Sequence, residues 1–231
     1  MRPGFGVGLA FAGLVSAIAV AQTGILPLPP NYKTTFENAD FLVMKVHYGA
    51  HELVPMHDHS AYPTLYVYLN DSGEVQLKHE GPQGFVAVRP PTHTGAFRIS
   101  PGMAERHSVQ SLSDTPSDFL RVEMKRIPVD DLKKVSRGEA PAEPTAPGTK
   151  TEFQDPALRV ERTMCPAAAT CELPKSTDRS LLVAVKATHV RVGSEDHALQ
   201  AGDTVWLSGV ESKPVVLGAG AQCLRVSLLY R

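Results

Sequence analysis

A strong charge of either sign is missing from this chain. Its 23 Lys and Arg residues nearly balance its 24 Asp and Glu residues, which leaves a formal net charge of −1. Proteins that bind nucleic acid usually carry a basic excess or a basic stripe. The balance therefore argues against a nucleic-acid partner.

Long apolar runs are absent after the first 21 residues. The run at residues 7–21 follows Arg2, is rich in small and aliphatic side chains, and ends in AVA, which has the form of a signal-peptidase site. At ~15 residues it is shorter than the ~20 that a membrane-spanning helix needs. We therefore expect residues 1–21 to be a cleaved signal peptide, with an uncleaved membrane anchor as the alternative. The mature chain, without a membrane span, is expected to be exported to the periplasm or the extracellular space.

Cysteine is scarce, and the three cysteines are Cys165, Cys171 and Cys223. They form no C-x-x-C pair, which makes a dithiol redox protein a weak hypothesis. In an exported protein one disulfide is plausible, because the compartment is oxidising. We favour a Cys165–Cys171 bridge, but only slightly over a bridge from either residue to Cys223.

Stretches suited to long helices are also missing, because 19 prolines and 18 glycines are spread along the chain. Short apolar runs alternate with turn signals instead, which predicts an all-β chain. A hairpin turn is expected at residues 70–73 (NDSG), and a short helix only at residues 129–135. The expected strands of the first half are residues 41–46, 64–69, 74–77, 85–88, 97–99 and 119–124.

A proline-rich segment divides the chain into two halves. Residues 137–150 (RGEAPAEPTAPGTK) have the composition of a linker. We expect one β domain at residues 22–136 and a second at residues 151–231.

The second half repeats the first in the order and spacing of four pairs of expected strands. FLVMKV at residues 41–46 aligns with LRVERT at residues 158–163, and FLRVEM at residues 119–124 aligns with CLRVSL at residues 223–228. This pattern predicts an internal duplication. The alternative is that two unrelated β domains share alternating Val and Leu.

Seven of the nine histidines lie in the first half. His57 and His59 form an H-x-H, and in an extended segment both imidazoles point to the same side, where their nitrogens can converge on one ion. His107 begins a later strand and could supply a third nitrogen. Three neutral imidazoles suit a divalent Fe, Mn, Ni, Cu or Zn ion and leave positions open for water or substrate. The alternative is that these are surface or packing histidines.

Gly49, His57, His59 and Gly73 form a pattern that resembles the first motif of the cupin superfamily, whose domain is a double-sheet jelly roll. The form of this motif in the family is G(x)5HxH(x)3-4E(x)6G, and here seven residues rather than five separate Gly49 from His57. The family's glutamate falls on Pro63 or Thr64. Glu52, Asp58 and Glu105 are nearby carboxylates that could compensate, although Asp58 should point away from its two neighbours.

The second motif has the form G(x)5PxG(x)2H(x)3N in the family. Pro101-Gly102 and His107 correspond to it here, with four residues rather than two between Gly102 and His107 and with Ser111 where the family has asparagine. The resemblance implies two tandem cupin-type jelly rolls, a bicupin, with His57, His59 and His107 as the metal ligands.

Strand parity predicts which side chains line the pocket. If Thr64 points toward the metal, Tyr66 and Tyr68 do so too, whereas Leu65 and Val67 point outward and must be covered by the other repeat or by a second subunit. Tyr66 and Tyr68 are then candidate catalytic or substrate-orienting groups beside a small-molecule ligand. The alternative exchanges the two faces.

The second repeat has lost the site. An ungapped alignment places Pro174 and Ser176 at the two positions of the H-x-H, and the third position falls near 213–214. Leu181, Val183 and Val185 replace Thr64, Tyr66 and Tyr68, which predicts a barrel filled with aliphatic side chains.

Two classes of function follow from these features. The first is an exported metal-dependent enzyme of the dioxygenase, isomerase or lyase type that acts on a small molecule. The second is a non-catalytic bicupin that binds a small molecule or a protein partner. A homodimer is allowed in either class.

Overall fold

The computed structural model describes residues 25–81, 84–129, 131, 132, 134–139, 142–209 and 213–229. These residues form strands and turns without a helix, so the all-β prediction is confirmed. No helix in this part of the chain is long and apolar enough to cross a bilayer. The predicted signal peptide, residues 1–21, lies outside the described residues.

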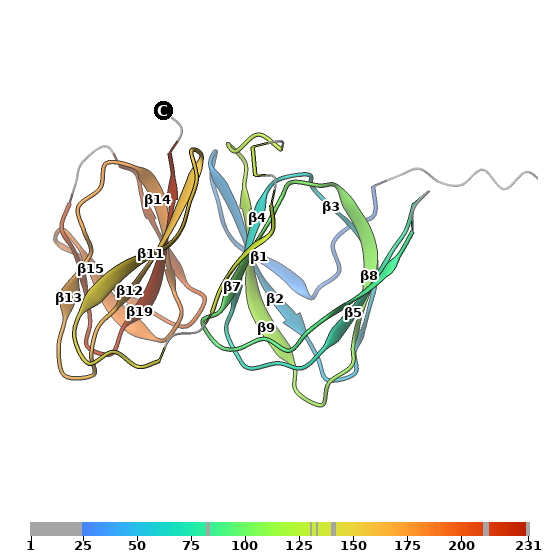
Figure 1. Ribbon diagram of the computed structural model, residues 1–231, viewed down its shortest axis with the longest axis horizontal. Helices are drawn as coiled ribbons and strands as arrows, with labels where there is room; N and C mark the ends of the chain where they lie inside the picture. Colours follow the sequence, from blue (N-terminus) through green and yellow to red (C-terminus); the bar gives the residue numbers. More distant parts are fainter. Residues whose placement is uncertain are drawn as a thin grey trace, which may run out of the picture.

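Two jelly rolls lie side by side, each built from two antiparallel sheets (Figure 1). In the first jelly roll, one sheet has the order β1-β2-β9-β4-β7-β10 and the other β3-β8-β5-β6. Its strands are β1 (Tyr32–Glu37), β2 (Phe41–Tyr48), β3 (Leu53–His59), β4 (Thr64–Tyr68), β5 (Val75–His79), β6 (Val86–Arg89), β7 (Phe97–Ser100), β8 (Glu105–Ser111), β9 (Ser117–Met124) and β10 (Ser136–Gly138).

The second jelly roll has sheets of order β11-β12-β19-β14-β17 and β13-β18-β15-β16. Its strands are β11 (Gly148–Gln154), β12 (Leu158–Met164), β13 (Cys171–Glu172), β14 (Arg179–Ala184), β15 (Thr188–Val192), β16 (Glu195–Leu199), β17 (Thr204–Leu207), β18 (Val215–Leu217) and β19 (Gln222–Leu228).

The strand orders show the duplication directly. The second repeat pairs its strands in the same sequence as the first, apart from the additional edge strand β10. Even an irregularity is shared: the ladder of β1 shifts register between Thr34 and Phe36, and that of β11 shifts between Thr151 and Phe153. The predicted internal duplication is therefore confirmed.

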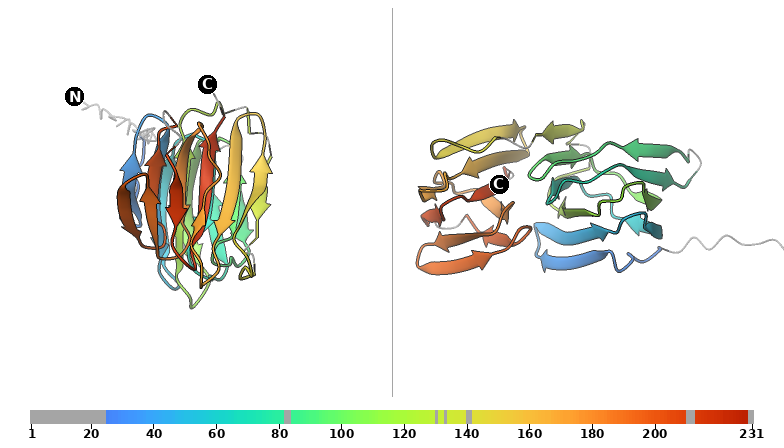
Figure 2. Two further views of the ribbon diagram at one scale, coloured as in Figure 1. Left: turned by 90° about the vertical axis from the view of Figure 1, so that its left-hand side faces the viewer. Right: turned by 90° about the horizontal axis from the view of Figure 1, so that it is seen from below.

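The largest apolar core lies between the two jelly rolls, where their longer sheets face each other (Figure 2). Leu65 and Val67 of β4 are fully buried there together with Leu181 and Val183 of β14. The outward-facing residues of β4 are thus covered by the other repeat. The sequence predicts either this cover or a second subunit. One smaller core lies inside each jelly roll.

Two local predictions are wrong, and the bounds of a third differ from the structure. Residues 70–73 form no hairpin, because β4 and β5 belong to different sheets and the segment crosses between them. The described residues of 129–135 are turns rather than a helix, since a segment this short cannot offset the cost of helix nucleation. Both ends of the expected linker, 137–150, are strand residues: they belong to β10 and β11, which pair with β7 and β12.

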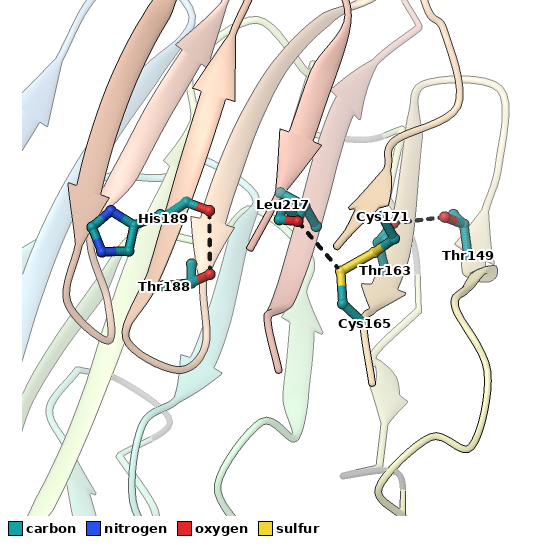
Figure 3. The surroundings of a disulfide bond; sticks show 7 residues. All are labelled: Thr149, Thr163, Cys165, Cys171, Thr188, His189 and Leu217. Atoms are coloured by element: carbon teal, nitrogen blue, oxygen red, sulfur yellow. Dashed lines mark hydrogen bonds between the residues drawn. A yellow bond between two sulfur atoms is a disulfide. The ribbon is translucent and has the colours of Figure 1, made fainter. Parts of the chain in front are cut away.

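A disulfide joins Cys165 and Cys171, as favoured from the sequence (Figure 3). Cys165 lies directly after β12 and Cys171 opens β13, so the bridge connects the two sheets of the second jelly roll. Cys223 is a free thiol and is fully buried in the same core. Burial raises the pKa of this thiol to about 12.

Candidate metal centre

The H-x-H lies on β3 with both imidazoles inside the first jelly roll. The relative exposure of His57 is 0% and that of His59 is 7%, whereas Asp58 between them points away. Asp58 binds Arg106 through two hydrogen bonds and accepts the Leu26 N–H, and these bonds lower its pKa to about 2. The alternation predicted for an extended segment is confirmed.

His107 completes the cluster from the neighbouring strand. In the ladder between β3 and β8 it stands opposite His57, which brings the two rings to 4.8 Å between centroids. His59 lies 5.0 Å from His107 and 4.7 Å from His57 on the same measure. One nitrogen from each of the three rings lies within 4.8 Å of the others.

Gly102 allows β8 to pass under the loop that follows β3. A Cβ at this position would lie 2.3 Å from the carbonyl oxygen of Ala61, which is far inside van der Waals contact. The Pro-Gly of the second motif therefore has a steric role, since it lets the strand carrying His107 approach the strand carrying the H-x-H.

The hydrogen bonds of His57 fix its tautomer. Its Nδ1–H donates to the carbonyl of Pro55 at 2.7 Å, so its Nε2 carries the lone pair. This Nε2 lies 3.1 Å from Nε2 of His59, close to the ~3 Å that separates two nitrogens bound at ~2.1 Å to one ion. Two nitrogens therefore converge on one point.

Several nitrogens of the cluster have no partner. Nδ1 of His59 and both ring nitrogens of His107 are buried without a hydrogen bond to the described residues. Buried polar atoms in proteins almost always find a partner, so unpartnered nitrogens in one small volume call for an additional group. The donor set, three imidazoles from two strands, fits a divalent transition metal.

The protein environment keeps these rings neutral. Burial lowers the pKa of His107 to about 3, with further lowering by His57 and His79. Burial also lowers the pKa values of His57 and His59, and the charge of Arg121 adds to the effect. A neutral imidazole is the form that binds a metal.

Tyr32 contacts the cluster and was missed by the sequence analysis. Its hydroxyl lies 3.0 Å from Nε2 of His57 and 2.5 Å from the hydroxyl of Tyr48. Burial raises the pKa of Tyr32, so it stays protonated and can donate to that nitrogen. Tyr32 opens the edge strand β1, and no sequence motif connects it with the histidines.

Of the three carboxylates that could replace the family's glutamate, only Glu105 lies at the site. Glu52 accepts hydrogen bonds from Asn31 and the N–H of Gly49, away from the cluster, and Asp58 pairs with Arg106. Glu105 precedes His107 by two residues on β8, so both side chains point inward, and a Glu105 oxygen lies 3.9 Å from Nδ1 of His107.

Glu105, His107 and His79 of β5 form a second set of atoms within 4.8 Å of one another. His79 stands opposite His107 in the ladder between β5 and β8. His57, His107 and His79 thus form one row across three strands, with His59 and Glu105 in the next row. His107 is common to both sets.

Thr64, where the family's glutamate could fall, is no ligand. It is buried and donates its hydroxyl to the carbonyl of Tyr62. The carboxylate beside it comes from β9, where Glu123 stands opposite Thr64 and binds Arg121 at 3.0 Å. This buried ion pair was also missed by the sequence analysis.

Tyr66 and Tyr68 face the inside of the first jelly roll, so their predicted orientation is correct. Both line a cavity of about 60 Å³ that His107 also borders. The hydroxyl of Tyr66 accepts a hydrogen bond from Arg121 at 2.6 Å. The cavity connects the tyrosines with the histidine cluster, and their catalytic role stays a prediction.

The ladders of the second repeat shift the predicted alignment by one residue. Leu65 of β4 faces Val122 of β9, and Leu181 of β14 faces Val226 of β19 in the same way. Leu181 therefore corresponds to Leu65 rather than to Thr64. An ungapped alignment cannot find such a shift, because a bulge in β3 adds one residue to the first repeat before β4.

The H-x-H positions of the second repeat are shifted for a related reason. In β3 a bulge between Val54 and His57 adds a residue. The pair of Cys171 and Leu217 in the second repeat corresponds to the pair of Val54 and Val109 in the first. Counting along the strands from this pair gives the residues at the three ligand positions of the second repeat. They are Leu173, Lys175 and Val215, instead of the predicted Pro174, Ser176 and 213–214.

The second repeat keeps no histidine at those positions, so the prediction that it has lost the site is supported. The prediction of a filled barrel holds only in part, because an aliphatic core packs one portion of the interior. A hollow of about 420 Å³ remains beside Leu173, Ser176 and Lys213, with Arg225 at its border. Arg225 is held by Glu161 and by the carbonyl of Pro174.

Known structures share this architecture at low sequence identity. The bacterial pirin YhhW from Escherichia coli in complex with nickel(II) matches with a TM-score of 0.59 at 14% identity, over 85% of this chain and 90% of that one. The protein YhaK from Escherichia coli matches with a TM-score of 0.57 at 12% identity, over 87% and 92%.

A third match is a variant of salicylate 1,2-dioxygenase from Pseudoaminobacter salicylatoxidans in complex with gentisate. Its TM-score is 0.55 at 12% identity, over 87% of this chain and 76% of that one. No protein-family model and no curated sequence matches this chain significantly. The shared architecture confirms the fold implied by the two motifs, which is a pair of tandem jelly rolls.

Proposed function

We propose that this chain binds one divalent transition metal through His57, His59 and His107 and presents it to a small molecule in the adjoining cavity, as a metal-dependent enzyme. The observation that carries the proposal is the convergence of three buried, neutral imidazoles whose nitrogens largely lack partners. Fe, Mn, Ni, Cu and Zn all accept such a donor set. The nickel-bound pirin and the dioxygenase with its organic ligand show that this fold can hold both kinds of ligand.

Several residues of the chain would serve such a reaction. A bound metal would supply Lewis acidity or redox chemistry. Pro55 holds the tautomer of His57, while Arg121 fixes the hydroxyl of Tyr66 at the cavity wall. Tyr32 and Tyr66 could then orient a ligand or pass a proton, which is the role predicted for Tyr66 and Tyr68.

Metal titration tests the ligand assignment. We expect the purified chain to bind about one equivalent of Ni²⁺ or Zn²⁺ in calorimetry and elemental analysis. His57→Ala and His107→Ala should each abolish binding, whereas His93→Ala, an exposed histidine on the same domain, should not. Full occupancy in the His57→Ala and His107→Ala variants would contradict the assignment. A metal-free chain that still binds small molecules would favour the non-catalytic alternative.

Export and assembly are further parts of the proposal. The Cys165–Cys171 disulfide supports an oxidising destination such as the periplasm or the extracellular space. N-terminal sequencing of the secreted protein should start at Gln22. A homodimer stays a prediction, which sedimentation velocity would test.

A further inference from the structure

Two arginines border the metal-site cavity from opposite sheets. Arg98 lies on β7 and Arg89 on β6, and both line the cavity of about 60 Å³ together with Tyr66 and Tyr68. Arg98 is 8% exposed and packs its guanidinium over the ring of Tyr66 at 4.3 Å. Its Nε is buried and has no hydrogen-bond partner among the described residues.

Glu105, which lines the cavity, and Glu123, which lies behind Arg121, interact with other groups. Glu123 pairs with Arg121 at 3.0 Å, and the carboxylate of Glu105 lies 3.9 Å from both Arg121 and His107. Among the described residues, no carboxylate lies within ion-pair distance of Arg89 or Arg98. Arg98 is buried and Arg89 is partly buried, and a cation removed from water without a counter-ion is costly, so an anion beside these two groups would be favourable.

Burial and the neighbouring charge act together on Arg89. They lower its pKa, with burial as the larger cause and Arg98 as the next. An anion between the two guanidinium groups would relieve this repulsion. A metal held by neutral histidines would add further positive charge to the same cavity.

The size and the lining of the cavity restrict which anions can bind there. A cavity of about 60 Å³ has room for a molecule of only a few heavy atoms, so a short molecule is favoured. Val75, Leu77, Val109 and Phe119 make part of the wall apolar. A second cavity of about 70 Å³ lies next to the first, because Arg89 and Arg98 line both. It extends the space for a ligand toward the exposed residues Arg137 and Glu139.

We infer that the cavity binds a short-chain monocarboxylate, whose carboxylate lies between the guanidinium groups of Arg89 and Arg98 and whose apolar end points toward the metal site. Planar guanidinium groups match a carboxylate with paired hydrogen bonds, and the apolar wall disfavours a fully hydrated anion such as phosphate. The two arginines need no metal to bind the carboxylate. Only the acid's role as a substrate rests on the proposed function.

The test observes Arg98 directly. Propionate would be titrated into the ¹⁵N-labelled full chain while the arginine Nε–Hε signals are followed by NMR, with and without Zn²⁺. We expect propionate to shift the Arg98 and Arg89 signals in both forms, whereas neutral propionamide should leave them unchanged. Arg98→Gln and Arg89→Gln should weaken propionate binding by about tenfold or more. Arg191→Gln, an exposed arginine of the second repeat, should bind as the parent does.

Controls separate folding from binding and this inference from the proposed function. Arg98→Lys keeps the charge and should retain part of the affinity, and the dispersion of the amide spectrum reports whether each variant is folded. Unchanged arginine signals in both forms, or a stronger response to phosphate than to propionate, would overturn the inference. A chain that binds propionate but not Zn²⁺ would instead contradict the proposed metal site and leave the carboxylate site standing.

Discussion

At the scale of single residues, the site depends on which polar atoms have partners. The Pro55 carbonyl, the Tyr32 hydroxyl and the neighbouring ring occupy the two nitrogens of His57, whereas both nitrogens of His107 lack a bond among the described residues. Glu105 lies between His107 and Arg121 at 3.9 Å from each. One carboxylate can therefore serve the metal site and the arginine network together.

Removing the charge of Glu105 should weaken metal binding. We expect Glu105→Gln to lower the affinity for Ni²⁺ by about 10- to 100-fold, the usual effect of losing a group that supports metal ligands. Glu74→Gln removes an exposed carboxylate of the same domain and serves as the control. Calorimetric titration of the two variants measures the difference, and equal affinities would show that Glu105 has no part in binding.

The thiol of Cys223 should be inert in the folded protein. Its pKa of about 12 lies above the working pH, so at pH 8 the group is protonated as well as buried. Ellman's reagent should therefore detect no thiol in the native chain and about one in denaturant without reductant, because Cys165 and Cys171 are bridged. Rapid reaction of the native protein, or three thiols after denaturation, would contradict this assignment.

At the scale of strands, alternate residues of β4 serve stability and the candidate site. Leu65 and Val67 point into the core between the two jelly rolls, while Tyr66 and Tyr68 point into the cavity. The two faces of a five-residue strand thus serve different purposes. Substitutions one residue apart should have separable effects.

Leu65→Ala should lower the free energy of unfolding by about 2–5 kcal/mol, because it leaves a hole in a fully buried core. Its metal affinity should equal that of the parent. Val88→Ala, at a 51% exposed position, should change stability by less than about 0.5 kcal/mol. Urea denaturation and metal titration measure the two properties, and a loss of metal affinity in folded Leu65→Ala would show that the faces are coupled.

At the scale of the whole molecule, the two repeats share their largest core. Ion pairs also cross the interface, where Lys45 binds Asp203 and Arg179 binds Asp40, both at 2.8 Å. Partly exposed pairs of this kind contribute little, so the buried apolar face dominates the interface. The second repeat thus covers the apolar face of the larger sheet of the first.

Separating the repeats should therefore destabilise the first. A fragment of residues 25–139 would expose the apolar face of its larger sheet, and we expect it to aggregate or to unfold at a clearly lower temperature than the full chain. Light scattering after gel filtration and thermal circular dichroism measure both outcomes. A monomeric fragment with the melting temperature of the full chain would show that the repeats are independent.

The sequence alone determined those features that depend on short-range periodicity. In an extended strand, side chains alternate with a period of two, so the H-x-H had to place both imidazoles on one side and Asp58 on the other. The same rule predicted the two faces of β4, and the repeated order of strand patterns predicted the duplication. These features need no knowledge of which strands are neighbours.

Only the tertiary structure decided which groups from distant segments meet. Arg98 and Glu123 reach the site through the pairing of strands far apart in the chain, and Tyr32 reaches His57 from the opposite sheet of the jelly roll. No local pattern encodes these contacts. The bulge in β3 also moved the alignment of the second repeat by a residue, which exchanges inward and outward positions. Periodicity fixes the side to which a residue points, whereas packing of the two sheets fixes what it contacts there.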